Sequence, residues 1–298
     1  MNGQRGIALI QVLLIAGIIG LLMAQLGLTA KEQVARAKLL DDRATLQLGA
    51  LSRESALVYS LLTEPWQQRP ASTNPYAAAW NFVGEPFTVD GITFTIQDES
   101  GRLRVPLYGS QEFESVLAGV GVEQGRARRI GAQLLELQGV ATRLRGLEEQ
   151  SSVDAPGTSR GYPLQDLAEL RLLPDMDDEL YSRLRPLLTL YPTPGFNPLT
   201  APAELLAAQL TPSEWQGLQD ARASGQLDAL TFMKLTGIQP DEMVTFSPGP
   251  AFEVDIAFEH GGSRIERNTT IIVRPYQVEP VAVWQRSVDP AGEGDSSS

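Results

Sequence analysis

The sequence begins with an apolar run that limits what the rest of the chain can fold into. Between Arg5 and Lys31 there is no charged residue, and from Ile7 to Leu28 two glutamines are the only polar side chains. An α-helix rises about 1.5 Å per residue, so about 20 apolar residues cross the hydrocarbon layer of a membrane. The run is therefore long enough to span a membrane, and we expect a membrane helix over residues 7–28.

The flanks of the run indicate its orientation and leave one alternative open. Arg5 is the only basic side chain before the run. By the positive-inside rule this end stays in the cytoplasm while the rest of the chain is exported. A secretory signal has a shorter apolar core of about 7–15 residues and ends in a small-x-small cleavage site. The segment AQLGLTA could serve as such a site after Ala30, so removal of the run is the alternative to anchoring.

Composition argues against several classes of function. The chain of 298 residues has 24 basic and 36 acidic side chains, a net charge of −12. This charge argues against general nucleic-acid binding, which depends on clustered cations. The absence of cysteine and the single histidine, His260, remove thiol nucleophiles, cysteine metal sites and almost every histidine-based catalytic arrangement. The scattered Asp, Glu and Ser residues offer no nucleophile–base pair, so we expect a protein that is not an enzyme.

The helical pattern continues past the apolar run. No proline occurs before Pro65, and Gly49 is a weak position within the second half. Apolar residues recur there at three- and four-residue steps, as on one face of an amphipathic helix. They are Val34, Ala37, Leu40, Ala44, Leu48, Leu51, Val58 and Leu62. We expect one helix from about residue 7 to about residue 62, with this apolar stripe covered by a globular domain.

Strand patterns flank a long helical region. The segment FTVDGITFTIQD has two alternating runs around Asp90-Gly91, a strong signal for a two-residue hairpin, and a second turn follows at residues 98–101. Strand character returns in FEVDIAFEH and SRIERNTTIIV, around a turn at residues 260–262, and in QVEPVAVWQRS. Between them lie short helices with start signals such as Thr211 before a proline. The pattern predicts an α+β fold, with a small antiparallel sheet packed on the long helix and a large all-α domain inserted in the sheet region.

The residues before the apolar run resemble the class III signal of type IV pilins and pseudopilins. Arg5-Gly6 directly precedes Ile7 and the apolar helix. In that superfamily a prepilin peptidase cleaves after the glycine, which is Gly6 here, and the new N-terminal residue, here Ile7, is N-methylated. The resemblance therefore implies a leader peptide of residues 1–6 and a membrane helix that is retained in the mature protein.

Gln11 departs from the pattern of most members, which have glutamate at this position. A carboxylate in hydrocarbon is costly unless it is paired, and in the superfamily its partner is the N-terminal amine of the neighbouring subunit. A neutral Gln11 avoids this cost but weakens recruitment into a repeating filament. We interpret Gln11 as an assembly position, and a merely tolerated polar residue is the alternative. The departure is typical of the general secretion pathway protein K family.

Internal segments resemble the same family. QDESGRLRV is similar to its Asp-x-x-Gly-x-Leu segment, and DLAELRLLPDMDDELYSRLRPLLTLYP to one of its helical segments. FEVDIAF fits the entry of its closing strand. An Asn-x-x-Thr-Ala-x-x-x-Leu motif is matched by Asn197, Thr200, Ala201 and Leu205. The likeness extends from Gly6 to about Val283.

This resemblance implies a type II secretion minor pseudopilin, a structural subunit that caps the pseudopilus tip and helps to initiate its assembly for protein export across the outer membrane. The expected partners are the I-, J- and H-type minor pseudopilins, the major pseudopilin and the prepilin peptidase, together with a secreted substrate or the outer-membrane secretin. No nucleic-acid partner is implied. The expected location is the inner membrane of a Gram-negative bacterium, with a single span and the bulk of the chain in the periplasm.

The pattern and the resemblance together predict six segments. They are a leader (residues 1–6), the membrane part of the helix (7–28), the rest of the helix with the first strands (29–105), the inserted all-α domain (106–248), the closing strands (249–288) and a disordered tail (289–298). Small residues in a membrane helix permit close approach of a partner helix. The expected packing positions are Ala16, Gly17, Gly20 and Ala24.

Two acidic segments are candidates for a metal site. Family members have an acidic calcium loop, but the corresponding interval here, with Glu148, Glu149 and Asp154, does not reproduce its spacing. Because calcium needs six to eight oxygen ligands, we carry over no ligand and expect no cofactor. Residues 175–179 are also acidic, but acidic residues are favoured in the first turn of a helix without any ion.

Two further patterns leave other functions open. The segment GVGVEQGRARR resembles a helix-hairpin-helix, in which Arg126, Arg128 and Arg129 could contact DNA phosphates; solvated arginines beside a tight interhelical turn are the alternative. His260, beside two glycines, is expected at a hairpin tip. The alternatives to a pseudopilin are a pilin-like or helix-hairpin-helix protein of a type IV pilus or DNA-uptake machinery, and a signal-anchored periplasmic enzyme.

Overall fold

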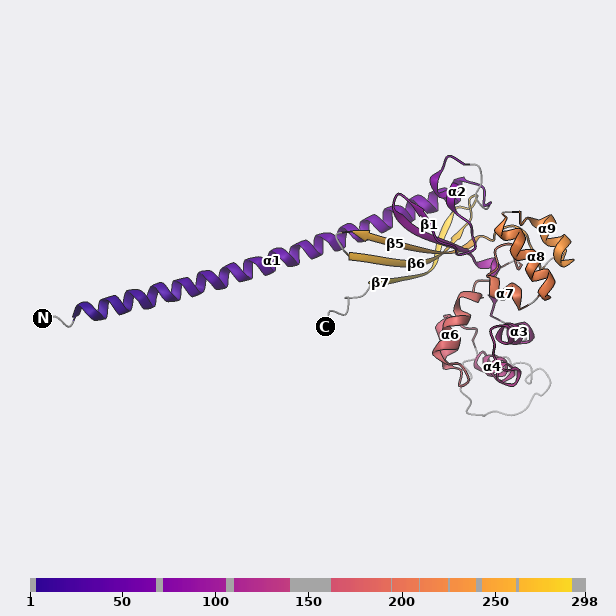
Figure 1. Cartoon of the computed structure of the whole chain (residues 1–298), viewed down its shortest axis with the longest axis horizontal. Helices are drawn as coiled ribbons and strands as arrows, with labels where there is room; N and C mark the ends of the chain where they lie inside the picture. The colour runs from indigo at the N-terminus through magenta and orange to yellow at the C-terminus, as the bar shows by residue number, and fades with distance from the viewer. Residues whose placement is uncertain are drawn as a thin grey trace.

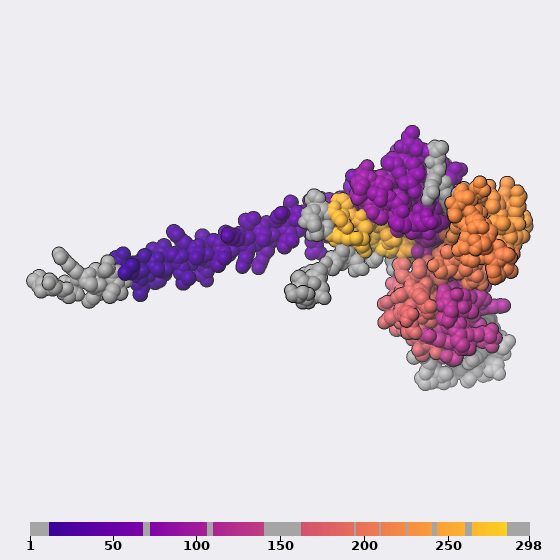
Figure 2. Space-filling model, in the orientation of Figure 1, coloured from indigo at the N-terminus to yellow at the C-terminus, as the bar shows by residue number. Residues whose placement is uncertain are grey.

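A single long helix dominates the computed structural model of the chain. The structure describes residues 4–67, 72–105, 110–139, 162–193, 195–208, 210–224, 226–239, 243–260 and 263–290. Helix α1 spans Gln4–Thr63, and its N-terminal part projects from the body of the molecule (Figures 1 and 2). Its 60 residues correspond to about 90 Å at 1.5 Å per residue. The predicted continuous helix is confirmed.

A five-stranded antiparallel sheet packs against the C-terminal part of α1 (Figure 1). Its strands are β1 (Phe87–Val89), β2 (Ile92–Asp98), β5 (Ala251–His260), β6 (Ser263–Val273) and β7 (Val281–Pro290). They lie in the order β1-β2-β5-β6-β7. The early hairpin therefore pairs with strands from the end of the sequence, as the α+β prediction requires.

The hairpin predictions are confirmed in register. Val89 pairs with Ile92, and both turn residues have positive φ, 49° at Asp90 and 77° at Gly91. Positive φ at both central residues is the geometry that an Asp-Gly pair favours. At the other hairpin His260 is the last residue of β5 and pairs with Ser263.

The core of this sheet domain lies between α1 and the inner face of the sheet. It contains side chains from α1, from the loop before β1 and from the strands, including Leu57, Leu61, Trp80, Phe82, Phe94, Phe252 and Ile271, all of which are buried. Helix α2 (Pro75–Ala79), capped by the side chain of Asn74, packs beside β1. The sheet domain is thus held to α1 by a continuous apolar layer.

Most of the predicted apolar stripe on α1 lies outside the face that the domain covers, and only its last members, Val58 and Leu62, pack against the core of the sheet domain. The covered face carries Leu46, Ala50, Leu57 and Leu61, all of which are buried. In contrast, the predicted stripe is largely exposed: its members Val34 and Leu48 are 70% and 67% exposed. The prediction was wrong because this half of α1 is apolar on two faces, and periodicity alone does not tell which of them the chain covers.

The second correction concerns Gly49, which the sequence identified as a weak position in the helix. A Cβ atom at Gly49 would lie 2.4 Å from Cε1 of Phe258, on β5. Real Cβ atoms do not approach other atoms this closely, so the glycine lets the helix and the sheet meet. Gly49 is therefore a contact position of α1.

The region between β2 and β5 is mainly helical and forms two lobes (Figure 1). Its described elements are η1 (Glu99–Gly101), β3 (Leu103–Arg104), α3 (Gln111–Gly119), α4 (Gln124–Leu137), η2 (Leu167–Leu172), α6 (Asp178–Leu184), η3 (Arg185–Leu187), β4 (Leu188–Thr189), α7 (Ala203–Ala207), α8 (Pro212–Ala223) and α9 (Ala229–Thr236). The first lobe (residues 110–190) contains α3, α4 and α6 around one apolar core. The second lobe (residues 203–236) contains α7, α8 and α9 around another.

Details of the insertion refine the expectation of an all-α domain. The two-residue strand β4 lies within it and pairs in parallel with β3, so a short strand pair joins the first lobe to the end of the sheet domain. The predicted start of α8 is confirmed, because Thr211 and Glu214 form a reciprocal capping box. Strand β7 runs through Pro290, two residues into the segment predicted as tail.

Candidate assembly helix and neck of the inserted domain

The first candidate site is the part of α1 that lies outside the body of the molecule (Figure 2). All side chains from residue 12 to residue 41 are exposed, and the helix is long and apolar enough to cross a membrane. The predicted packing positions Ala16, Gly17, Gly20 and Ala24 lie in this segment. Within the described residues, no atom outside the helix backbone lies within 4 Å of a Cβ placed at Gly17 or Gly20. These positions are open to a partner helix.

The predicted processing site lies in the first turns of α1. The backbone of Gly6, Ile7 and Gln11 is helical, while their side chains are outside the described part of the molecule. Cleavage, methylation and the assembly role of Gln11 therefore stay predictions.

The second candidate site is the neck, where the chain leaves the sheet domain and returns to it. Its centre is Asp98, the last residue of β2, which is fully buried. One carboxylate oxygen, Oδ2, accepts hydrogen bonds from Ser100 Oγ at 2.6 Å and Thr200 Oγ1 at 2.7 Å. It also accepts one from Asn197 Nδ2 at 3.2 Å. The other oxygen, Oδ1, accepts from the backbone N–H groups of Ser100 at 3.0 Å and Gly249 at 3.1 Å.

Asp98 therefore joins three segments that are distant in sequence: the end of β2, the segment before α7, and the segment that re-enters the sheet at β5. Burial raises the pKa of Asp98, and the hydrogen bonds from Ser100, Thr200 and Gly249 act in the opposite direction. A buried carboxylate without these donors would be strongly unfavourable. The neck is thus stable only when all three segments are in place.

Two of the motifs singled out in the sequence meet at this point. Gly101 belongs to the QDESGRLRV segment, and a Cβ there would lie 2.5 Å from the backbone oxygen of Thr200. The backbone N–H of Asn197 donates to the oxygen of Ser100 at 2.7 Å, and Gln97 Nε2 donates to the oxygen of Thr200 at 3.0 Å. The motif residues are therefore contact residues of the neck.

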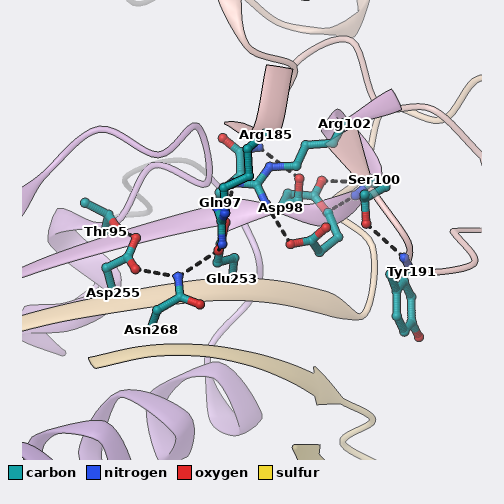
Figure 3. Close-up of polar contacts among 12 residues, drawn as sticks. Thr95, Gln97, Asp98, Ser100, Arg102, Arg185, Tyr191, Glu253, Asp255 and Asn268 are labelled. Carbon is teal, nitrogen blue, oxygen red and sulfur yellow. Dashed lines mark hydrogen bonds and ion pairs between the residues drawn. The ribbon is translucent and has the colours of Figure 1, made fainter. Parts of the chain in front are cut away.

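A charged group lies beside the Asp98 cluster (Figure 3). Glu253 of β5 is buried and forms ion pairs with Arg102 and with Arg185, the latter at 2.8 Å. Arg102 also contacts Glu99 at 3.0 Å. Burial opposes the charge on Glu253, but the two arginines outweigh it and lower the pKa of Glu253 to about 2. Because Arg185 follows α6, this pair binds the first lobe to the sheet.

The buried acids of the neck do not line a substrate-sized cavity. The hollow beside Glu99 and Glu253 has a volume of about 40 Å³, which is room for little more than one water molecule. A larger hollow of about 290 Å³ lies on the sheet and includes Thr95, Asp255 and Asn268. Its carboxylate Asp255 accepts from Thr95 and Asn268 (Figure 3). The buried carboxyl groups of the neck are therefore part of the packing between the sheet domain and the insertion.

The helix-hairpin-helix resemblance corresponds to α3, a turn and α4. The carboxylate of Glu123 accepts from the backbone N–H groups of Gly125 and Arg126, so an acidic side chain occupies the helix N-terminus where a phosphate would bind. Arg126 contacts Asp177 at 2.6 Å, and Arg129 contacts Asp175 at 3.2 Å. Two of the three candidate DNA contacts are thus neutralised within the first lobe.

The same contacts account for the acidic segment at residues 175–179. Asp177 caps α6 by accepting from Leu180 N at 2.7 Å, and Asp175 accepts from Gln133 as well as Arg129. Within the described residues, no group of three or more potential metal ligands is present. The arrangement fits arginine binding and does not fit a calcium site, while Glu148, Glu149 and Asp154 lie outside the described residues.

Sequence reasoning missed the charged partners at the neck and on α1. Glu54 of α1 forms a buried ion pair with Arg267 of β6 at 3.0 Å, and Glu253 pairs as described above. The available signal was a charged residue at a position where a strand or a helix face should be apolar. Glu54, on the covered face of α1, carries that signal. Glu253 does not, because it alternates with Phe252 and Val254 as a residue on the polar face of a strand would.

Comparisons with known proteins agree with this architecture. A family model described as "Type II secretion system (T2SS), protein K" matches residues 96–193, which include Asp98, Arg102 and Arg185 of the neck. The type II secretion system protein K of Klebsiella pneumoniae is 30% identical over 275 residues, covering 82% of this chain and 83% of that protein. The chain belongs to the type II secretion system protein K family.

Two further relatives are consistent with this assignment. The protein K of Pectobacterium carotovorum subsp. carotovorum is 28% identical over 80% of this chain and 81% of its own length. A chain in the crystal structure of the GspK–GspI–GspJ complex from the enterotoxigenic Escherichia coli type 2 secretion system has the same fold, with a TM-score of 0.56 at 19% identity. The match covers 85% of this chain and 99% of that chain.

Membership of the protein K family confirms the resemblance inferred from the sequence. The chain is a minor pseudopilin of the type II secretion system, with the pilin-like α+β fold that was expected. The matched interval of the family model starts in β2 and ends after β4. It therefore covers the first lobe and one side of the neck.

Proposed function

We propose that this protein K chain caps the tip of the pseudopilus and helps to initiate its assembly. The observation that carries the proposal is the separation of two features along the molecule. A bare apolar helix lies at one end and a wide helical insertion at the other (Figure 2). The helix can pack beside other subunits, whereas the insertion would hinder lateral repetition in a thin filament. A subunit of this shape suits the end of a fibre.

The exposed stripe on α1 is the face best suited to a neighbouring subunit. Its members Val34, Leu40, Leu48 and Leu51 are exposed, whereas Leu46 and Ala50 are covered by the sheet. Exposed apolar stripes of this kind commonly mark interaction sites. Closer to the N-terminus, the small residues Ala16, Gly17, Gly20 and Ala24 permit close helix contact in lipid. Together these positions support helix-on-helix packing along residues 7–62.

We infer the partners from the family and from the related complex. The similar chain of Escherichia coli comes from a complex of GspK, GspI and GspJ, so I- and J-type minor pseudopilins are the first expected partners. An H-type minor pseudopilin and then the major pseudopilin would come next along the pseudopilus, on the side toward its base. A secreted substrate or the outer-membrane secretin would meet the inserted domain.

Processing and location belong to the same proposal. A prepilin peptidase would cleave between Gly6 and Ile7, and Ile7 would then be N-methylated. Residues 7–28 would cross the inner membrane once, with the bulk in the periplasm of a Gram-negative bacterium. The boundaries 29–105 and 106–248 remain our proposal for the domains, with the closing strands extended from residue 249 to residue 290, where β7 ends. The role is structural, without catalysis or a cofactor.

The first experiment determines the N-terminus of the mature chain. The full chain is co-expressed with a prepilin peptidase, purified in detergent and analysed by intact-mass and N-terminal peptide mass spectrometry. We expect a methylated N-terminus at Ile7, and retention of the leader in a Gly6→Leu control. A mature chain that begins at Met1 or at Lys31 would exclude this processing.

The second experiment tests the exposed stripe. Leu48→Arg places a charge in the stripe, and Gln47→Arg places the same charge on a neighbouring exposed position of the same helix. We expect Leu48→Arg to reduce co-purification with I- and J-type subunits at least about tenfold, a cost of about 1.4 kcal/mol, while Gln47→Arg has little effect. Equal recovery of both variants would contradict the assignment of this face.

A further inference from the structure

The two edges of the sheet differ in how well they are protected. Strand β1 forms one edge, has only three residues and packs beside α2. Strand β7 forms the other edge and has ten residues, paired only with β6 among the described strands. Alternate residues of such a strand direct their backbone N–H and C=O groups away from the sheet. Long edges of this kind pair readily with another strand unless they are blunted.

Apolar side chains gather at the start of this edge. Tyr276 and Val278, in the loop before β7, are fully exposed, and Val283 and Trp284 are 51% and 54% exposed. The register leaves Trp284 as an extra residue, because Gln285 pairs with Thr270 while Val283 pairs with the next residue of β6. This bulge places the Trp284 indole edge-on against Tyr191, with ring centroids 5.8 Å apart. The start of β7 is therefore fixed, and part of its apolar surface stays open.

The cover provided by α1 stops short of β7. Ile271 of β6 faces α1 and is 1% exposed. Val283 is its partner in the register, so it points to the same side of the sheet, yet half of its surface is accessible. The inner face of β7 is thus open beside α1. An added strand would continue the sheet and shield both Val283 and the free backbone groups.

The position of β7 indicates which polypeptide would supply that strand. Strands β5, β6 and β7 run alongside α1 on the side nearer its bare N-terminal half, whereas the helical lobes lie at the opposite end (Figure 1). Strand β7 begins at the neck, where Trp284 lies against Tyr191, and runs back toward the bare half of α1. A neighbouring subunit packed along α1 would therefore meet the end of β7 first and would reach Val283 by following the edge of the sheet toward the neck. We infer that β7 is a strand-addition edge that takes an extended segment of an adjacent minor pseudopilin. This inference rests on the proposed function, because it requires subunits packed on α1.

Hydrogen exchange of the full chain in detergent tests the inference. Amide exchange in β7 is measured for the chain alone and for its co-purified complex with I- and J-type subunits. Strand addition predicts that alternate amides from Val281 to Asp289 exchange at least about tenfold more slowly in the complex. Amides of β1, at the other edge, serve as the internal reference and should not change.

Matched variants separate strand addition from contact by side chains alone. Val283→Lys places a charge on the open edge without disturbing a buried residue, and charged edge residues oppose strand addition. Thr88→Lys makes the same change on β1, where the side chain is also exposed. We expect Val283→Lys to abolish the protection of β7 while its melting temperature stays unchanged, and Thr88→Lys to retain the protection.

The possible outcomes separate failure of the strand-addition inference from failure of the proposed function on which it rests. If the complex forms but β7 exchanges as fast as in the isolated chain, strand addition is excluded and the tip proposal stands. If β7 becomes protected only with exported cargo, the assigned occupant is wrong. If no complex with I- and J-type subunits forms, the proposed packing fails and the inference fails with it.

Discussion

At the scale of single residues, Asp98 has the largest structural role. Its carboxylate accepts hydrogen bonds from four residues, two of which lie about 100 positions later in the sequence. Because it is fully buried and has no direct ion-pair partner among the described residues, its charge is stabilised by dipoles alone. The orientation of those donors is therefore what the neck must preserve.

Replacing Asp98 by asparagine tests this role. In either orientation of its amide, asparagine turns an NH₂ group toward buried donors, which are Thr200 Oγ1 and Asn197 Nδ2 on one side and the backbone N–H groups of Ser100 and Gly249 on the other. At least one buried donor therefore loses its acceptor. We expect Asp98→Asn to lower the free energy of unfolding by about 2–3 kcal/mol, measured by denaturant unfolding of the full chain in detergent. Asp255→Asn, at an exposed carboxylate of the same sheet, should change it by less than about 1 kcal/mol. Similar losses at both positions would contradict a special role for Asp98.

Glu253 gives a prediction about pH. Its pKa in the folded chain is about 2, against 4.5 for an unperturbed glutamate, so the unfolded state binds the proton first as the pH falls. The stabilising contribution is present above pH 4.5 and is lost as the pH falls toward 2. We expect about 3 kcal/mol of acid-dependent destabilisation from this group.

Burial raises the pKa of Asp98 and Glu99, so their protonation affects the pH dependence of stability with the opposite sign to that of Glu253. Comparing the parent chain with Glu253→Gln isolates the contribution of Glu253, because both chains contain Asp98 and Glu99. The difference in unfolding free energy between the parent chain and Glu253→Gln should shrink from pH 6 to pH 2. A constant difference across this range would show that the charge of Glu253 does not stabilise the fold.

At the scale of elements, the contact between α1 and the sheet depends on Gly49. Alanine would favour the helix by about 1 kcal/mol, but its Cβ would collide with the ring of Phe258. Overpacking of this kind costs about 1–3 kcal/mol, so we expect Gly49→Ala to be net destabilising. In a Phe258→Leu background the same change should be neutral or stabilising. Thermal unfolding of the four combinations measures the coupling, and its absence would remove the proposed contact.

Local signals predicted most elements correctly. The length of α1, the Asp90-Gly91 hairpin and the capping box at Thr211 each depend on residues within a few positions of one another, and each agrees with the structure. Side-chain periodicity also predicted both groups of strands, the early hairpin and the strands near the end of the sequence. These features are readable because helix caps, turns and strand alternation are short-range properties.

Long-range contacts were not predictable in the same way. The motif segments around Asp98 and Thr200 were recognised one by one, but 102 positions separate the two residues that meet. The stripe on α1 failed for a related reason: Leu46 and Leu48 are both apolar, and the sheet covers only the first. Which face is covered depends on residues across the interface that are distant in sequence, such as Phe258 opposite Gly49.

At the scale of the whole molecule, the insertion leaves the sheet domain and rejoins it at one place. Asp98 and Phe252 are neighbours in the register of β2 and β5, so the chain leaves and returns through adjacent strands. The apolar core of the sheet domain is separate from the cores of the two lobes. A glycine-serine linker could therefore join the two strands directly.

We replace residues 103–248 by such a linker and add Asp98→Ser, which removes the buried carboxylate that would lose its donors Asn197 and Thr200. We expect this chain to keep its sheet domain. Near-ultraviolet circular dichroism should retain the signal of the buried Trp80, and α1 should still anchor the chain in detergent micelles. If the near-ultraviolet signal is lost and all strand amides exchange as fast as in an unfolded chain, the sheet domain needs the lobes to fold. The parent chain with only Asp98→Ser is the control.

For the tip position proposed above, the neck has a mechanical consequence. One buried carboxylate and one buried ion-pair group tie both sides of the insertion to the strands, and those strands are packed on α1 through Ala50, Leu57 and Leu61. A load applied to the lobes would thus pass into the rod as compression, without bending at the joint. In that position, loosening the neck would let the lobes tilt relative to α1, and force along the helix would no longer pass directly into them.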